Sequence, residues 1–125
     1  TVDMFSGRPN PSFEITDPKE IVHLRNGLKD LKEVVIITGE EIREFGRLGY
    51  RGILITNSAG INGIPSRVQF LNGKVRVFSE EGNKDKFLKD VAAGMEKYYL
   101  GLAKKRGLIP KDLMDKGIVP DPDTM

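Results

Sequence analysis

Apolar and polar residues alternate on both sides of Asn72-Gly73, where the stretch from residue 67 to residue 78 reads R-V-Q-F-L-N-G-K-V-R-V-F. Both central positions of a type I′ turn need a positive φ, and Asn and Gly adopt it at the least cost, so this pair predicts a two-residue hairpin loop. In the resulting register one face carries the apolar side chains of Val68, Phe70, Val75 and Val77. The opposite face carries Arg67, Gln69, Arg76 and Phe78. A slip of one residue would mix the two sets, so the turn and the pattern agree on one register.

Two longer segments space their apolar residues by three and four, which is the pattern of an amphipathic helix. The first segment starts at Asp17-Pro18, an N-cap followed by proline, with Glu20 at the capping-box spacing. Its apolar stripe is Ile21, Leu24, Leu28 and Leu31. The second segment, residues 83–105, is predicted to be the longest helix and to end before Gly107. Its apolar stripe is Phe87, Val91, Met95, Tyr98 and Leu102.

Shorter apolar runs predict further strands at residues 2–5, 13–16, 34–37 and 53–56, and residues 34–37 are continuous enough for a central strand. A second capping-box pattern, from Thr38 to Glu41, predicts a short helix through Ile42 and Phe45 that ends near Gly46. This order of elements favours an α+β fold, with a mostly antiparallel sheet of four to six strands and both long helices on one face. The other sheet face is then expected to be partly open and to carry the arginines.

The chain is expected to form a single globular domain over residues 1–107, followed by a C-terminal tail over residues 108–125. The tail contains several prolines and aspartates, and its apolar residues could dock it against the domain. No apolar run approaches the ~18 residues of a membrane span, so we expect a soluble chain with no membrane partner. The sequence leaves the cellular compartment open.

The composition excludes several kinds of chemistry. The chain has no cysteine, so it has no disulfide, thiolate nucleophile or cysteine-ligated metal, and its single histidine, His23, rules out a multi-histidine metal site. We expect neither a metal nor a cofactor. The serines lie in no nucleophile-elbow pattern, and the histidine has no partner motif. A pair of carboxylates, Asp3 and Glu14 on neighbouring strands, remains open, and with it the question of whether the protein is an enzyme.

The net charge is only +2, but basic residues gather in one part of the chain. Residues 45–79 contain no Asp or Glu, whereas five basic residues fall within them: Arg47, Arg51, Arg67, Lys74 and Arg76. Such segregation predicts a locally positive surface on a nearly neutral protein. A basic, partly aromatic sheet face can bind nucleic acid, and the alternative interpretation is a solvated face whose arginines pair with nearby acids.

A stiff turn with two recognition side chains is the second candidate site. Residues 6–11 read S-G-R-P-N-P, and the two prolines would hold Arg8 and Asn10 in extended backbone. Arginine offers a planar fork of donors, which suits an anionic or polar ligand. A connector stiffened by proline is the alternative. The stretch DMFSGRPNPSFE resembles the N-terminus of small microbial proteins that share the motif FSGRPNP, and this resemblance implies no activity.

These patterns favour a small binding module that recognises an anionic or polar partner. The expected ligand-binding residues are Arg8, Asn10, Arg51, Arg67, Lys74 and Arg76. The alternative is a small enzyme or ligand-binding protein with a pocket between the 6–11 turn and the loop of residues 57–66. That loop is rich in glycine but lacks the pattern of a nucleotide-binding loop, so a plain connection is the simpler interpretation of it. Nucleic acid and a second copy of the chain are the other partners considered.

Overall fold

The computed structural model describes residues 2–5, 12–13, 15–33, 38–44, 50–57, 60–79, 85–109, 114–115 and 119–123. Within them the strands form one sheet in the order β2-β1-β4-β5-β6-β7-β3, and every pairing is antiparallel. Five strands have four or more residues: β1 (Val2–Phe5), β4 (Tyr50–Thr56), β5 (Arg67–Leu71), β6 (Lys74–Val77) and β7 (Lys86–Lys89). The two-residue strands β2 (Ser12–Phe13) and β3 (Lys32–Glu33) extend the sheet at its edges. The predicted α+β class and antiparallel sheet are confirmed.

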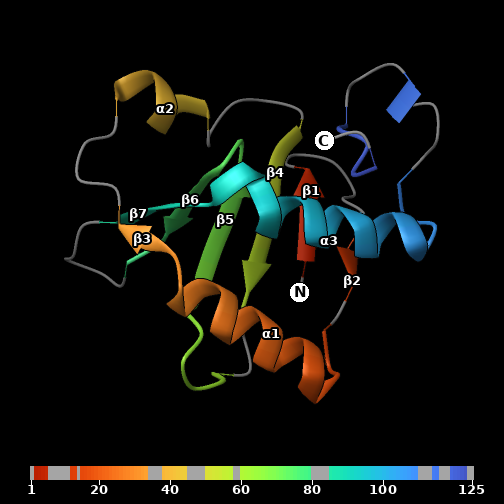
Figure 1. Ribbon diagram of the computed structural model, residues 1–125, viewed down its shortest axis with the longest axis horizontal. Coiled ribbons are helices and arrows are strands. Elements are labelled where there is room, and N and C mark those ends of the chain that lie inside the picture. Colours follow the sequence, from red (N-terminus) through yellow and green to blue (C-terminus); the bar gives the residue numbers. More distant parts are fainter. Residues whose placement is uncertain are drawn as a thin grey trace.

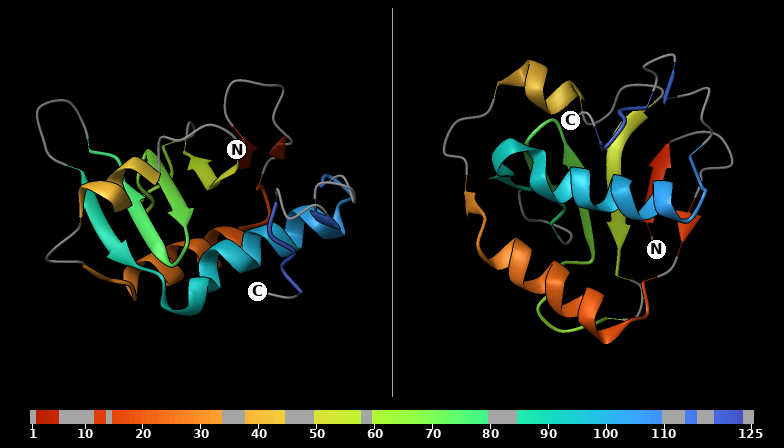
Figure 2. Two further views of the ribbon diagram at one scale, coloured as in Figure 1. Left: turned by 90° about the horizontal axis from the view of Figure 1, so that it is seen from above. Right: turned by 45° about the vertical axis from the view of Figure 1, so that its right-hand side comes forward.

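The two long helices lie on one face of this sheet, as predicted (Figure 1). They are α1 (Pro18–Lys29) and α3 (Gly94–Lys105), and α3 is preceded by the short 3-10 turn η1 (Val91–Ala93). The view from above in Figure 2 places both helices on the same side of the strands. The short helix α2 (Gly39–Glu44) matches the one expected from the second capping box. We call the sheet face that α1 and α3 cover the helix-side face, and the opposite one the outer face.

The central hairpin has the predicted register. Phe70 lies opposite Val75, and Gln69 lies opposite Arg76. The turn residues Asn72 and Gly73 have φ angles of 50° and 78°, as a type I′ loop requires. The four apolar hairpin residues face the helices and join the core, as predicted from the alternation.

The predicted helix over residues 83–105 is wrong in its first half. Residues Lys86–Lys89 form strand β7, which pairs with β6, and the helix begins only at Gly94. Local spacing favoured a helix, but the backbone groups of this segment form their hydrogen bonds with strand β6 instead. The helix begins where the Asp90 carboxylate accepts hydrogen bonds from the backbone N–H groups of Met95, at 3.0 Å, and Glu96, at 3.2 Å. Val91, predicted to lie on the apolar stripe, is 71% exposed.

Helix α1 starts as its sequence predicts, because the Asp17 carboxylate accepts from the Lys19 backbone N–H at 2.9 Å. The carboxylate of Glu20 accepts a hydrogen bond from the Tyr98 hydroxyl of α3 at 2.8 Å. This bond ties the two helices together, and the His23 ring lies over the same tyrosine, with ring centroids 4.1 Å apart. Burial and the neighbouring carboxylate raise the pKa of Tyr98.

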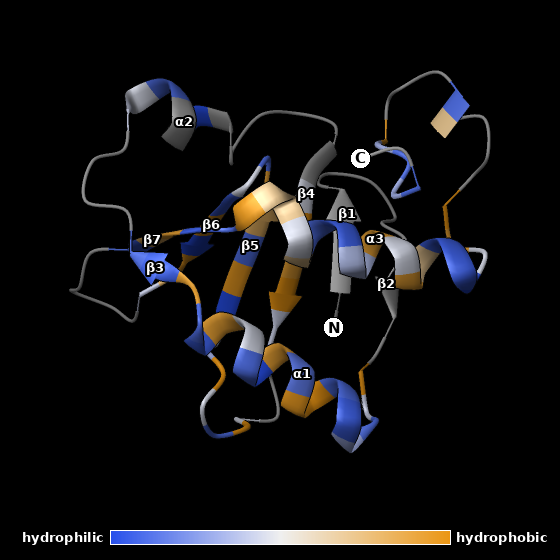
Figure 3. Cartoon of the chain, in the orientation of Figure 1, coloured by the Kyte–Doolittle hydropathy of each residue, from blue (hydrophilic) through white to orange (hydrophobic). Residues whose placement is uncertain are grey.

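The core lies between the helices and the helix-side face of the sheet. Figure 3 shows apolar residues interleaved with polar ones along α1 and α3, as expected for helices with one buried side. Phe70 and Tyr99 stack at the centre with ring centroids 6.0 Å apart, and both are fully buried. Other fully buried apolar side chains of this core include Ile53, Leu100, Val68 and Val75.

The described part of the tail packs on the domain. Ile109 and Val119 are buried and belong to the core, and Lys104 of α3 bonds to the Asp121 carboxylate at 3.0 Å. Helix α3 ends at Lys105, and Gly107 has a φ of 70°, as expected of a C-terminal cap. The boundary at residue 107 therefore matches the end of a helix, while independent folding of residues 1–107 stays a prediction.

Two sequence predictions fall outside the described residues. These are the central strand at 34–37 and the turn at 6–11, which includes Arg8 and Asn10. The predicted strand at 13–16 is shorter than expected, because β2 ends at Phe13 and residues 15–17 lead without regular structure into the capped start of α1.

Candidate functional site

The hairpin register places three predicted site residues on the outer face. Arg76 lies opposite Gln69, and Lys74 lies opposite Leu71. Because side chains alternate along a strand, Arg67 falls on the same face as Gln69. Arg51 lies within β4, but its side chain is outside what the structure describes. The structure therefore brings together Arg67, Lys74 and Arg76.

Two arginines lie over one aromatic ring on this face. The guanidinium carbon of Arg67 lies 4.7 Å from the centroid of the Phe78 ring, and that of Arg76 lies 4.6 Å from it. A cation over an aromatic face is worth about 0.5–1 kcal/mol at an exposed site. The backbone supports the arrangement, because the Phe78 N–H donates to the Arg67 carbonyl at 3.1 Å. The result is a cluster of two cations and one aromatic ring on the outer face.

One of these arginines is also paired with an acid. The Nε of Arg76 donates to the Asp85 carboxylate at 2.8 Å, and a second guanidinium nitrogen lies 2.7 Å from the same oxygen. The other carboxylate oxygen accepts from the Ser79 backbone N–H at 2.9 Å. These bonds, that of Ser79 foremost, lower the pKa of Asp85. The alternative interpretation of paired arginines thus holds for Arg76, whereas Arg67 has no ion pair with any described residue.

Three lysines form a row across the outer face beside the hairpin tip. Lys74 of β6 lies opposite Lys89 of β7, and Lys89 lies opposite Lys32 of β3. Like charges directly opposite each other in neighbouring strands disfavour pairing, because their Cβ atoms are only about 4.5–5.5 Å apart. Sequence reasoning missed two of the three, since it placed residues 86–89 in a helix. Strand β7 reads K-F-L-K and does not alternate, so no local pattern marked it as a strand.

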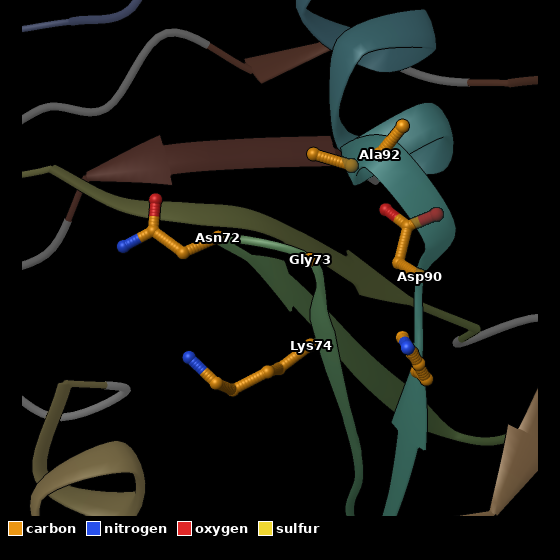
Figure 4. A pocket seen from close by; sticks show the side chains of 7 residues that line it. Asn72, Gly73, Lys74, Asp90 and Ala92 are labelled. Atoms are coloured by element: carbon orange, nitrogen blue, oxygen red, sulfur yellow. The ribbon is translucent and has the colours of Figure 1, made fainter.

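A cavity of about 560 Å³ adjoins this row at the hairpin tip (Figure 4). Both Lys74 and Lys89 line it, together with the turn and the segment before α3. Asp90 also lines it, but Figure 4 shows its carboxylate turned toward the start of α3 and the Lys74 side chain turned away from it. That carboxylate already accepts from two backbone N–H groups of α3, so it is engaged in capping. The cavity is thus lined by two lysines and by an aspartate whose carboxylate is engaged in capping α3.

The backbone around this cavity is held firmly. The Asn72 N–H of the turn donates to the Glu96 carboxylate of α3 at 2.7 Å, and the Asp90 N–H donates to the Gly73 carbonyl at 2.8 Å. Ala92 and Ala93 have φ angles of 55° and 53°, a left-handed conformation that costs an alanine energy. Such strain persists where surrounding contacts impose it, so the walls of the cavity are set by the fold.

The outer face is not open throughout. Gln69 is 5% exposed and Leu71 is 1% exposed, although both belong to this face by register. Exposed or half-buried residues lie around them, and these include Lys32, Leu54, Thr56, Arg67, Lys74, Arg76, Phe78, Phe87 and Lys89. This face is therefore partly exposed and carries Arg67 and Arg76 with lysines beside them, while a basic binding surface there stays a prediction.

The alternative pocket between the 6–11 turn and the 57–66 loop stays a prediction, because the turn lies outside the described residues. The Asn57 side-chain amide donates to the carbonyls of Ile61 and Ile64, and its oxygen accepts from the Ile61 N–H, so one side chain organises the loop. The cavity next to it measures only about 40 Å³ and is lined mostly by apolar residues. Asp3 pairs with Ser12 in β2, and its proposed carboxylate partner Glu14 lies outside the described residues.

Comparison with models of protein families, with curated proteins and with solved structures finds no match to this chain. The resemblance at residues 3–14 therefore stays an expectation. Among the described residues no group of three or more His, Asp or Glu could hold a metal ion. In the same part of the chain no helix has both the length and the apolar content needed to cross a membrane.

Proposed function

We propose that this protein is a small binding module that recognises an extended anion through the outer face of its sheet. The observation that carries the proposal is the row of lysines 32, 89 and 74, continued by the two arginines around Phe78. The turn with Arg8 and Asn10, and Arg51 in β4, remain proposed additions to this surface.

The cost of the lysine row supports a functional role. Neighbouring like charges destabilise the folded chain, and a ligand with several negative charges relieves that repulsion when it binds. Lys89 and Lys32 have no ion pair with any described residue. Four of the five basic residues in β5, β6 and β7 fall on the outer face by register, and only Lys86 falls on the helix-side face.

The aromatic residues on this face narrow the class of ligand that we propose. Phe78 is half-buried with two guanidinium groups near its ring, and Phe87 lies opposite Arg76 on the same face. Single-stranded nucleic acid is bound in general by such combinations, in which cations follow the phosphates and aromatic rings stack on bases. We therefore propose single-stranded nucleic acid ahead of a sulfated polysaccharide, which has the charge but no flat base.

The test is binding of a short single-stranded oligonucleotide and of heparin, measured by fluorescence anisotropy and competition at two salt concentrations. The variant Arg67→Gln/Lys89→Gln should weaken oligonucleotide binding at least tenfold, because it removes two phosphate partners. The matched control is Lys86→Gln/Lys105→Gln, which removes the same charge from the helix-side face of β7 and from the end of α3.

Equal weakening by both double variants would show that only net charge matters and would contradict a defined surface. Heparin binding without oligonucleotide binding would leave the polyanion site but remove the role of Phe78. Loss of binding in Arg8→Ala or Asn10→Ala alone, together with a weak dependence on salt, would indicate that the ligand binds at the 6–11 turn.

A further inference from the structure

A second cavity lies on the helix-side face, away from the lysine row. It measures about 430 Å³ and is enclosed by α1, by the loop that leads to β5, and by β6 and β7. Figure 1 shows that loop running past α1 at the end of the sheet. Cavities of roughly 300–1,000 Å³ are typical of sites for small molecules.

The floor of this cavity is apolar. Leu28 of α1, Val77 of β6 and Leu88 of β7 line it, and the last two are only partly covered by the core they pack against. Leu88 lies opposite Val75 in the sheet, and Val77 lies two residues after Val75 in β6, so both side chains point to the helix side. Apolar surface left partly exposed in a concave place favours an apolar ligand group.

The rim of the same cavity is cationic. Arg25 and Lys29 line it from α1, where a spacing of four residues puts them side by side on one helix face. Lys86 lies opposite Val77 and so belongs to the same side of the sheet. None of the three has an ion pair with a described residue. Glu33, opposite Leu88 at the sheet edge, is an acid that the register places on this side.

Arg25 carries a donor that the described residues leave without an acceptor. Its Nε is buried and has no hydrogen-bond partner, which is costly for a polar group of a charged side chain. The stem of Arg25 is packed against Gly63, where an added Cβ would come within 2.9 Å of Cδ and 3.0 Å of Nε. Gly63 has a φ of 82°, so glycine is required for both the turn and the contact. The loop thereby holds the guanidinium at the rim.

We propose that this cavity binds a small carboxylic acid with an apolar body, such as a medium-chain aliphatic acid. The carboxylate pairs with Arg25 and Lys29, because a guanidinium fork matches a carboxylate in shape and charge. The apolar body covers Leu28, Val77 and Leu88. This site is independent of the proposed outer-face function, since it lies on the other side of the sheet.

The experiment titrates octanoate into the full chain and follows backbone amide NMR signals. Saturable shifts at Leu28, Val77 and Leu88, with the outer-face Arg67 unchanged, are expected. Two probes separate the parts of the ligand: 1-octanol has the same body without the charge, and acetate has the charge without the body. Both should bind at least tenfold more weakly than octanoate.

Two variants complete the test. Arg25→Met keeps most of the side-chain volume and removes the charge, and it should weaken octanoate binding at least tenfold, whereas the control Lys105→Met on α3 should leave it unchanged. Lys29→Gln alters only an exposed side chain and should weaken binding several-fold even where Arg25→Met proves unstable. Octanoate binding unaffected by Lys29→Gln, octanol binding as tight as octanoate, or no saturable shift at the cavity residues would each overturn the proposal.

Discussion

The two faces of the central hairpin share one backbone and differ in nearly every other respect. On the helix-side face Val68, Phe70 and Val75 are fully buried and belong to the core. On the outer face Arg67 is exposed, and Lys74 and Arg76 are half-buried beside Phe78. The first face lowers the free energy of the folded state through burial. The outer face gathers like charges, and their repulsion raises the free energy of the folded state.

Residues whose placement burial does not explain are the ones to examine for function. Burial explains Val68, Phe70 and Val75, so these three hairpin residues need no ligand. The lysine row has no such explanation, since folding alone would favour alternating charges across the strands. The predictions below test whether stability belongs to one face and recognition to the other.

The largest expected effect comes from removing the tail. A fragment that ends at Gly107 loses Ile109 and Val119, which are 6% and 0% exposed in the core. Each buried side chain of this kind is worth about 1.5–3 kcal/mol, so the fragment should keep a cooperative transition but lose about 3–6 kcal/mol of unfolding free energy. Urea denaturation of the fragment and the full chain measures the difference. A fragment as stable as the full chain would mean that the tail does not support the core.

Truncation of the central aromatic should cost nearly as much. Phe70→Ala removes a fully buried ring that stacks on Tyr99, and we expect a loss of about 3–5 kcal/mol. Its outer-face counterpart, Arg67→Ala, should lose less than about 1 kcal/mol, because it gives up one exposed cation–π contact. Thermal and chemical denaturation of the two variants compare the faces directly. Similar losses of stability in both variants would show that the two faces contribute equally to stability.

The hairpin turn should show an intermediate effect. Gly73→Val places a β-branched residue at a φ of 78°, and an added Cβ would lie 3.2 Å from the Asp90 carbonyl oxygen. We expect a loss of about 1–3 kcal/mol. Asn72→Ala should be milder, because alanine has a smaller penalty at positive φ. Denaturation that finds Gly73→Val as stable as the parent would show that the turn is misplaced.

Reversing the charge of Lys89, the middle lysine of the row, should separate stability from oligonucleotide binding. Lys89→Glu turns two repulsive pairs, with Lys74 and Lys32, into attractive ones, so unfolding free energy should rise by about 0.2–1 kcal/mol for each pair. Oligonucleotide binding should fall over the same change. A variant that gained stability and kept its binding would show that the row has no role in recognition.

The smallest expected effect is a dependence on pH at the outer face. The pKa of Asp85 is lowered in the folded state, chiefly by the Ser79 N–H, so its stabilisation is present above the unfolded pKa of about 3.9 and is lost as the pH falls through the folded pKa. Asp85→Asn should therefore cost less than about 1 kcal/mol near neutral pH and almost nothing in strong acid. Urea denaturation at both pH values checks this, and an equal cost at both would contradict it.

Sequence reasoning found the hairpin because its signals are local. Asn72-Gly73 sets the turn, and the alternation on each side can be satisfied in only one register. It missed β7 because Phe87, Val91 and Met95 are also spaced as on a helix. Only the pairing of residues 86–89 with β6 makes this segment a strand, and that pairing cannot be seen in a short stretch of sequence.

The same limit explains what was missed at the candidate site. Arg67, Lys74 and Arg76 were placed on one face because the hairpin register could be derived. Lys89 and Lys32 join them only through the pairing of β6 with β7 and of β7 with β3.

The most direct test of the central claim is the salt dependence of oligonucleotide binding to the unaltered chain. Each phosphate neutralised on a single strand contributes a slope of about −0.7 to the plot of log K against log salt concentration. Three to four contacts from the lysine row and Arg67 predict a slope of about −2 to −3, reduced by about one contact in Lys89→Gln. A slope near zero, or a slope that Lys89→Gln leaves unchanged, would contradict recognition through the outer face.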